Sequence, residues 1–308
     1  MDASGFEREY GSVWSGTLEG AFFNINKFDK HRVLNIAETC YNNGLNKEKG
    51  YYVLGVDVGR VACTTEVVVI KVKPQQTGVD KKDIVNIFTF EEEHFGQQAI
   101  HIKRLFRDFK CNMCVIDANG LGIGLIDYML DDQDDPDTGE PLPTLGIYNY
   151  DDMDDGTKRN YKGLEEQSNN LVKNAMWLMK ANVPLNSEMY SYVQNQLQSG
   201  KIDLLIDSNV AKNKLMAQSQ GKRMNAVQRA EKLRPFVETD ILKNQLSNLI
   251  QENEGANIIL KQSSRKILKD KVSALMYGLY WCKVQEDKRG RRKGRNISDF
   301  LFFSPGKM

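Results

Sequence analysis

The stretch YYVLGVDVGR, residues 51–60, places an aspartate at the end of an almost uninterrupted apolar run. A run of this kind predicts a strand buried on both faces of a sheet. A carboxylate is costly to bury there unless a partner or a metal compensates its charge. Two more aspartates have comparable settings: Asp117 ends the apolar run of CVIDANGLG (114–122), and Asp270 lies in the apolar helical pattern KILKDKVSALMYGLYW (266–281).

Residue spacing predicts which way the three aspartates face. Strand alternation groups Asp57 with Val53 and Tyr51, and Asp117 with Val115 and Met113. In the late helix, a stripe at helical spacing should face the sheet, and it consists of Ile267, Asp270, Ala274, Tyr277 and Trp281. If the two strands are neighbours and the helix packs across them, the three carboxylates converge.

Three converging carboxylates favour one kind of chemistry. Like charges within a few ångströms disfavour joint ionisation, so the cluster would repel itself unless cations bind. Two divalent cations about 3.5–4 Å apart relieve that repulsion, activate a water and stabilise a leaving oxygen. Oxygen ligands favour Mg²⁺ or Mn²⁺ over zinc. The pattern therefore predicts metal-dependent phosphodiester hydrolysis, with Asp57, Asp117 and Asp270 as catalytic metal ligands.

Each aspartate also has a structural alternative. Asp117, two residues before Asn119, could form an Asx turn or cap the next helix. Asp57 could be a turn residue before Gly59, and Asp270 could be a solvated charge on its helix. These alternatives stay open for each residue taken alone, and the joint arrangement favours catalysis.

The pattern along the chain predicts an α/β fold with a mixed sheet flanked by helices. Short connections after the first strand favour antiparallel hairpins, and a later strand–helix–strand crossover implies parallel pairing. Expected strands are 51–58, 66–72, 84–93, 111–117, 145–148 and 257–261; expected helices are 32–42, 98–109, 122–130, 168–181, 188–197, 210–218, 225–233, 237–252 and 266 to about 285.

Composition limits the functional classes. The formal charge is +1, from 42 basic and 41 acidic side chains, so only local clustering can argue for nucleic acid. No apolar run approaches the roughly 20 residues of a membrane span, and the N-terminus lacks a signal-peptide pattern. Five cysteines fit a reducing, cytosolic compartment. Cys111 and Cys114 form a lone C-x-x-C pair that favours burial over zinc binding.

Several other mechanisms are excluded by missing motifs. GLGIG (120–124) lacks the third glycine of a dinucleotide-binding loop, so no such cofactor is expected. No phosphate-binding loop for ATP is present, because neither Gly200 nor Gly221 has the required flanking residues. The presence of only three histidines and the absence of G-x-S-x-G argue against a serine hydrolase.

Two basic clusters are candidates for phosphate contacts, which bind DNA without reading its sequence. The candidate DNA-binding residues are Lys212, Lys214, Lys222, Arg223 and Arg229 in the first cluster, and Arg289, Arg291 and Arg292 in the second. Gly290 and Gly294 predict that the second cluster, 288–295, is a flexible tail. The alternatives are a solvated helix face and a solubilising end. The acidic segments 131–140 and 151–155 are expected to face away from the DNA.

GVDVGR (55–60), VIDANGLGIGLIDYML (115–130) and KDKVSALMYGLYW (269–281) resemble the nuclease domain of the large terminase subunit of tailed bacteriophages. The resemblance covers roughly residues 50–285, and FEREYGSVW (6–14) is similar to the segment that joins motor to nuclease. It implies a ribonuclease H/integrase-like fold, Mg²⁺ or Mn²⁺, and cleavage of concatemeric double-stranded viral DNA during packaging. By match of motif, Asp57, Asp117 and Asp270 take the metal-ligand roles.

The resemblance also implies domains, partners and location. It divides the chain into a linker (1–48), a nuclease domain (49–287) and a basic tail (288–308). Implied partners are double-stranded DNA, a packaging motor ATPase module, the portal and the small terminase subunit, in the cytoplasm of the infected bacterium. Two features depart from the family pattern: the ATPase half is absent, and the further acid that many relatives carry early in the second strand is replaced by Thr64-Thr65-Glu66, where Glu66 is a candidate substitute as a metal ligand. A junction resolvase and a non-catalytic DNA-binding or assembly module are the alternatives.

Overall fold

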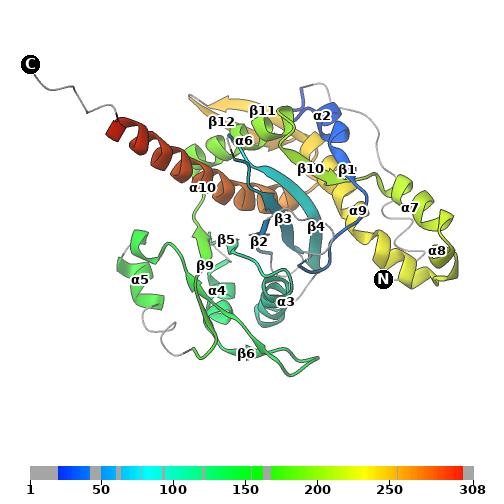
Figure 1. Ribbon diagram of the computed structural model, residues 1–308, viewed down its shortest axis with the longest axis horizontal. Coiled ribbons are helices and arrows are strands. Elements are labelled where there is room, and N and C mark those ends of the chain that lie inside the picture. Colours follow the sequence, from blue (N-terminus) through cyan, green and yellow to red (C-terminus); the bar gives the residue numbers. More distant parts are fainter. Residues whose placement is uncertain are drawn as a thin grey trace, which may run out of the picture.

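Eight strands form one mixed sheet in the computed structural model of the chain, and helices cover both faces (Figure 1). The structure describes residues 20–41, 50–59, 64–76, 78–91, 94–119, 122–153, 155–161, 168–254 and 256–300, with only the backbone for 291–300. The strand order is β1-β10-β4-β3-β2-β5-β9-β8. The strands are β1 Arg32–Leu34, β2 Tyr51–Asp57, β3 Thr64–Lys73, β4 Lys81–Glu91, β5 Met113–Asp117, β8 Thr144–Ile147, β9 Leu171–Met179 and β10 Ile202–Leu205.

Of the eight strands in this sheet, β3 alone runs antiparallel to its neighbours. β2, β3 and β4 form an antiparallel meander, whereas β5 pairs parallel to β2, β9 parallel to β5, and β8 parallel to β9. On the other side, β10 is parallel to β4, and β1 is parallel to β10. The run β4-β3-β2-β5-β9, with the first strand of the meander at its centre, is the order of a ribonuclease H-like sheet. It confirms the predicted fold class.

Two sets of helices enclose the sheet. Strand side chains such as Val53 and Val115 pack with α2, α6, α9 and α10, while Tyr52 and Leu54 pack with α3 and α4 on the opposite face. The helices are α2 Ile25–Lys30, α3 Phe95–Asp108, α4 Gly122–Leu130, α5 Asp155–Tyr161, α6 Val183–Gln198, α7 Ser208–Ala217, α8 Ser219–Arg223, α9 Ala226–Ser247 and α10 Asp270–Phe300, with the 3-10 turn η1 Tyr150–Asp152. Two small ribbons lie outside the sheet, β6 Gln133–Asp134 with β7 Pro141–Leu142, and β11 Leu249–Glu254 with β12 Asn257–Gln262. None of the described helices combines the length and apolar character that crossing a membrane requires.

Several predicted elements are wrong. Residues 168–181, predicted as a helix, contain β9, and β10 was not predicted. The helix predicted over 32–42 is replaced by β1 within the described residues, because Arg32 donates hydrogen bonds to the carbonyls of Leu205 and Ile206 and ties this segment to β10. The two helices predicted over 225–233 and 237–252 are one continuous helix, α9, which ends at Ser247 and is followed by β11.

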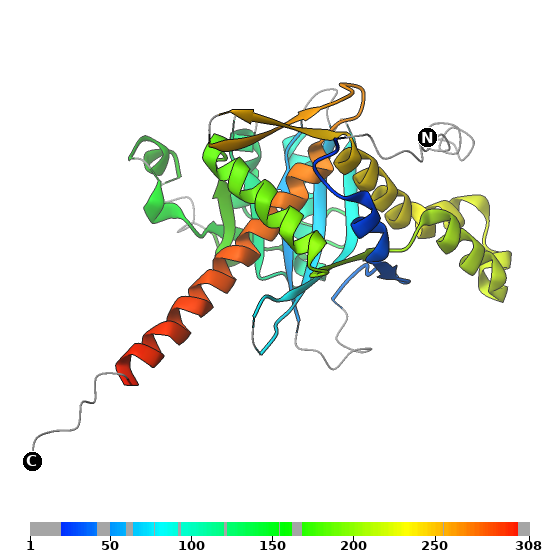
Figure 2. The ribbon, with the colours of Figure 1, turned by 90° about the horizontal axis from the view of Figure 1, so that it is seen from above.

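The basic segment expected as a flexible tail also differs. Residues 288–300 continue α10 in helical conformation, and residues 301–308 lie outside the described residues, as do 1–19 of the expected linker. Figure 2 shows the C-terminal half of α10 projecting from the sheet, on the side opposite to α7 and α8. The two basic clusters therefore lie on opposite sides of the molecule.

Candidate active site

One row of polar residues crosses four neighbouring strands near one end of the sheet. Asp57 is paired with Glu66 across β2 and β3, and Glu66 is paired with Thr89 across β3 and β4. On the other side, the parallel pair Val56 and Ile116 places Asp57 beside Asp117 at the ends of β2 and β5. Since neighbouring strands lie about 4.8 Å apart, the side chains of this row point to the same face as neighbours. That face is the one covered by α10.

A glycine brings α10 directly onto the central strand. A Cβ added to Gly55 would lie 2.0 Å from the carbonyl oxygen of Ala274 and 2.8 Å from the nitrogen of Gly278, so only hydrogen fits between strand and helix. Asp57 is two residues beyond Gly55, and Asp270 is about one turn before Ala274. The close approach therefore carries Asp270 to the end of the sheet where Asp57 lies.

The ends of all three aspartate-bearing elements are fixed by hydrogen bonds. After Asp57, the N–H of Gly59 donates to the hydroxyl of Thr65 at 2.9 Å, and its carbonyl accepts from Gln98 at 3.1 Å. After Asp117, the N–H of Ala118 donates to the carbonyl of Met179 at 2.8 Å. At the start of α10, the side-chain oxygen of Gln245 on α9 accepts from the N–H of Lys271 at 3.0 Å.

Asp57 carries the clearest electrostatic sign of convergence. Burial, followed by the charges of Asp270 and Asp117, raises the pKa of Asp57 to about 8, against a lowering by Lys269. Both neighbouring aspartates thus act on the ionisation of Asp57. This is the behaviour expected of three carboxylates that meet at one place.

The pKa values of the other two aspartates are raised as well, mainly by burial. For Asp117 the N–H of Asn119, at 2.9 Å, and the side chain of Tyr277 hold the pKa down through hydrogen bonds. The Asx turn considered for Asp117 is therefore present, alongside its proximity to Asp57. Asp270 is the first residue of α10, where a negative charge also favours the helix dipole.

The three aspartates are neighbours, but they do not form a complete set of ligands around one ion. Among the described residues, no three His, Cys, Asp or Glu side chains already stand close enough to hold one ion. The donor set nonetheless suits hard cations, because it consists of carboxylate oxygens. All three aspartates are partly exposed, so ion and substrate can reach them.

Comparison with known proteins gives matches among solved structures. The chain is similar to phage large terminase nucleases. The large terminase nuclease from thermophilic phage G20c is 12% identical, with 84% of this chain and 97% of that chain covered and a TM-score of 0.45. The nuclease domain of the large terminase subunit of bacterial virus Sf6 is 11% identical, covering 83% and 96%, with a TM-score of 0.43. The HK97 bacteriophage large terminase is 11% identical, covering 83% and 42%, with a TM-score of 0.40.

No family model matches the sequence, and no curated protein matches it. Structures of the G20c nuclease include forms with bound magnesium and with bound cobalt. At these identities and TM-scores, the similarity adds nothing to the functional argument, which rests on the residues of this chain.

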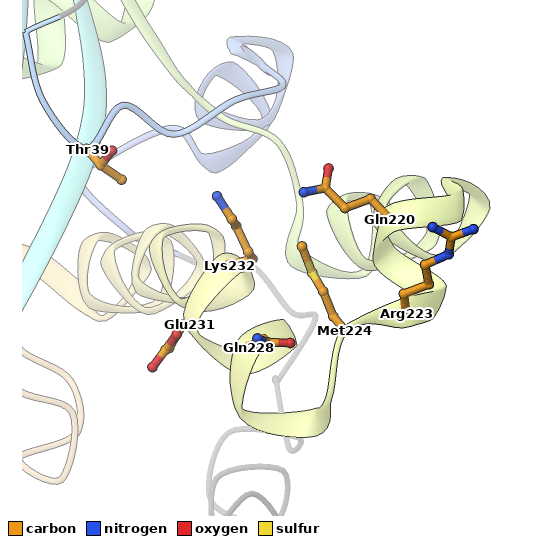
Figure 3. A pocket seen from close by; sticks show the side chains of 7 residues that line it. All are labelled: Thr39, Gln220, Arg223, Met224, Gln228, Glu231 and Lys232. Carbon is orange, nitrogen blue, oxygen red and sulfur yellow. The ribbon is translucent and has the colours of Figure 1, made fainter.

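The first basic cluster lies on an outlying group of helices formed by α7, α8 and the start of α9. Lys212, Lys214, Lys222 and Arg223 are exposed there, while Arg229 is half-buried and donates to the carbonyl of Asn225. A pocket of about 550 Å³ opens between these helices and the segment after β1 (Figure 3). Its lining residues are Thr39, Gln220, Arg223, Met224, Gln228, Glu231 and Lys232.

The second cluster is engaged in part. Arg289 donates to a carboxylate oxygen of Asp80, whose side chain is buried, so this arginine has a structural partner. Arg291 and Arg292 lie on α10, and their side chains are outside the described part of the structure. Cys111 and Cys114 are both buried and burial raises the pKa of each thiol, as expected for structural cysteines.

The roles of the residues that hold the aspartates in place were not predicted from the sequence. Lys271, in the first turn of α10, and Gln245, which accepts a hydrogen bond from its backbone N–H, are both buried, and Tyr277 contacts Asp117. Lys271 had a recognisable signal: it precedes Leu275, Gly278 and Cys282 at helical spacing, so it lies on a buried stripe.

Proposed function

We propose that the chain is a metal-dependent endonuclease that cuts concatemeric double-stranded viral DNA during genome packaging, with little sequence preference. One observation carries the proposal: Asp57, Asp117 and Asp270, far apart in sequence, meet at one end of the sheet beneath α10. Phosphodiester hydrolysis needs charge compensation and an activated water, and a carboxylate cluster is suited to recruit both.

Each aspartate has a part in this reaction. Asp57, Asp117 and Asp270 would hold Mg²⁺ or Mn²⁺, two ions in the proposed mechanism, which supply a bound water of lowered pKa and stabilise the leaving oxygen. Asp57, on which the charges of both other aspartates act, would be the ligand that the ions share. Tyr277 orients Asp117 through its hydrogen bond, and Lys269 lowers the pKa of Asp57.

We assign DNA backbone contacts to Lys212, Lys214, Lys222, Arg223 and Arg229, with Arg291 and Arg292 as a second contact region. Basic side chains neutralise phosphates without reading bases. Arg289 would first have to leave Asp80, so we rank it last among the candidates.

The proposal extends to context. We assign residues 49–287 to the nuclease, 1–48 to a linker and 288–308 to a basic extension that continues from α10. The working partners would be a packaging motor ATPase module, the portal and the small terminase subunit, in the cytoplasm of an infected bacterium.

The test is cleavage of supercoiled plasmid with Mg²⁺, Mn²⁺ or EDTA, comparing the wild type with Asp117→Asn. The proposal predicts metal-dependent nicking and linearisation by the wild type and none by the variant. DNA binding without cleavage under every metal, with the motor module supplied, would favour the non-catalytic binding module. Preferential cleavage of four-way junctions over linear duplex would favour a resolvase.

A further inference from the structure

Beside the three aspartates lies a buried ion-pair cluster with a different composition. The Nζ atom of Lys271 is 2.6 Å from an oxygen of Glu66, 3.0 Å from an oxygen of Glu238 on α9 and 2.7 Å from the hydroxyl of Thr89. The side chains of Lys271, Glu66 and Glu238 are 4%, 3% and 7% exposed. An ammonium group has three N–H donors, and this geometry provides an acceptor for each.

Both oxygens of Glu66 are engaged in this cluster. One accepts from Lys271 and from Thr89 at 2.7 Å, and the other accepts from the hydroxyl of Thr64 at 3.0 Å. Yet Glu66 stands directly opposite Asp57 in the register of β2 and β3. Glu66, which its position in the sequence suggests as a further metal ligand, therefore already accepts a hydrogen bond from Lys271.

Charge and connectivity explain what the cluster can do. Lys271 joins α10 to β3 through Glu66 and to α9 through Glu238, and it is the residue immediately after Asp270. Arg234 stands 3.7 Å from Glu238 and adds a second positive charge, so the cluster is close to neutral. A buried, neutral and fully hydrogen-bonded cluster of this kind adds little net stability, and its main effect here is to fix the positions of its side chains.

We propose that Lys271 is a positioning residue of the nuclease site, and that Glu66 serves as its anchor, not as a metal ligand. The cluster holds the first turn of α10 against β3 so that Asp270 faces Asp57 and Asp117. This inference rests on the proposed nuclease function and narrows it: the ions are held by three aspartates.

The experiment is a double-mutant cycle of Glu66→Gln and Lys271→Met, read by Mn²⁺ titration calorimetry and by plasmid cleavage at saturating Mn²⁺. Loss of groups that orient ligands costs about 10–100-fold in metal affinity or activity. We expect Lys271→Met to lose about that much, because it leaves two buried carboxylates beside Asp57. Adding Glu66→Gln should restore part of the loss, and Glu66→Gln alone should bind as many Mn²⁺ ions as the wild type.

A ligand role for Glu66 would give a different pattern. Glu66→Gln would then lose a bound ion, as Asp57→Asn does, and the double variant would be weaker than either single variant. That result would overturn the inference. If Lys271→Met does not fold, Glu238→Gln in place of it keeps the cycle measurable, because it removes one arm of the same cluster and leaves the lysine paired.

A matched control separates positioning from general destabilisation. Lys82 is also fully buried and its Nζ atom lies 2.6 Å from Glu286, but it pairs with α10 about 22 Å along the helix from Lys271. Lys82→Met should lower stability while leaving Mn²⁺ binding and cleavage per folded molecule unchanged. If Lys82→Met and Lys271→Met lose Mn²⁺ affinity and cleavage equally, compared at equal folded fraction, the cluster has only a structural role.

If the wild type neither binds Mn²⁺ nor cuts DNA, the proposed function itself fails, whatever the variants do to stability.

Discussion

At the scale of single residues, the feature that distinguishes this protein is a carboxylate placed where its charge is unfavourable. Asp57 ends a strand whose preceding residues are buried, and two other aspartates act on it. Its pKa is raised to about 8, so at neutral pH the folded chain keeps a proton on Asp57 that the unfolded chain has lost. Such strain is common where function requires a particular cluster of charges.

The raised pKa predicts how stability depends on pH. The unfolded carboxyl releases its proton near pH 4, whereas the folded one retains it until about pH 8, so stability falls as pH rises through this window. We expect Asp57→Asn, studied in EDTA, to be more stable than the wild type at pH 8–9. Because Asp57 is partly exposed, the gain should be about 1–3 kcal/mol. Denaturant unfolding of the wild type and of Asp57→Asn at pH 4 and pH 9 measures this gain. If the difference in unfolding free energy between the two proteins is the same at both pH values, the account is contradicted.

The three aspartates could be picked out from the sequence, whereas the contacts of the residues around them could not. Asp57 and Asp117 are visible because nothing else in their apolar runs is charged. Lys271 lies on an apolar stripe of its helix, but nothing in the sequence indicates that it pairs with Glu66 and Glu238. Only the packing of α9 and α10 on the sheet shows that they are buried together.

At the scale of elements, the site depends on the contact between β2 and α10. We expect Gly55→Ala to destabilise the fold by about 2–4 kcal/mol and to abolish cleavage, because the new methyl would meet the backbone of Ala274. Gly290→Ala, in α10, is the control glycine substitution: nothing lies within 4 Å of its added Cβ, and alanine should stabilise the helix by up to about 1 kcal/mol. Thermal unfolding and plasmid cleavage compare the two. An active, stable Gly55→Ala variant would show that the close approach is not required.

Element by element, sequence patterns predicted the meander and the first crossover, and failed where tertiary pairing decides. Residues of β9 include Leu, Lys, Ala and Met, which favour helices, but β9 lies between β5 and β8 and its last five residues are mostly buried. β10 has four residues, too few for a periodic signal, and its identity as a strand depends on β4 and β1. The end of α10 was obscured by glycines that the helix accommodates.

At the scale of the whole molecule, a net charge near zero conceals an uneven distribution. Exposed cations gather on α7 and α8, away from the C-terminal half of α10 (Figure 2). The α7–α8 region is the first candidate for DNA contacts, since Lys212, Lys214, Lys222 and Arg223 are exposed there.

Salt dependence tests that region. We expect Lys222→Ala/Arg223→Ala to weaken binding to all DNA sequences and to lower the slope of log affinity against log salt by about 2, the value for two lost phosphate contacts. Lys30→Ala/Lys173→Ala removes two exposed cations outside both clusters and should leave the slope unchanged. Fluorescence anisotropy between low and moderate salt gives both slopes. If the two double variants have equal slopes, DNA does not bind at the α7–α8 region.

The most direct test of the central claim is the rate of plasmid cleavage as a function of Mn²⁺ concentration for Asp57→Asn, Asp270→Asn and Asp287→Asn. The last variant is the control, since Asp287 lies on the same helix as Asp270 and pairs with Lys283 at 2.8 Å, away from the cluster. We predict wild-type cleavage for Asp287→Asn and a loss of about 10²–10³-fold for the other two, an effect typical of removing groups that stabilise transition-state charge. Cleavage that survives in both Asp57→Asn and Asp270→Asn would contradict the assignment of this site.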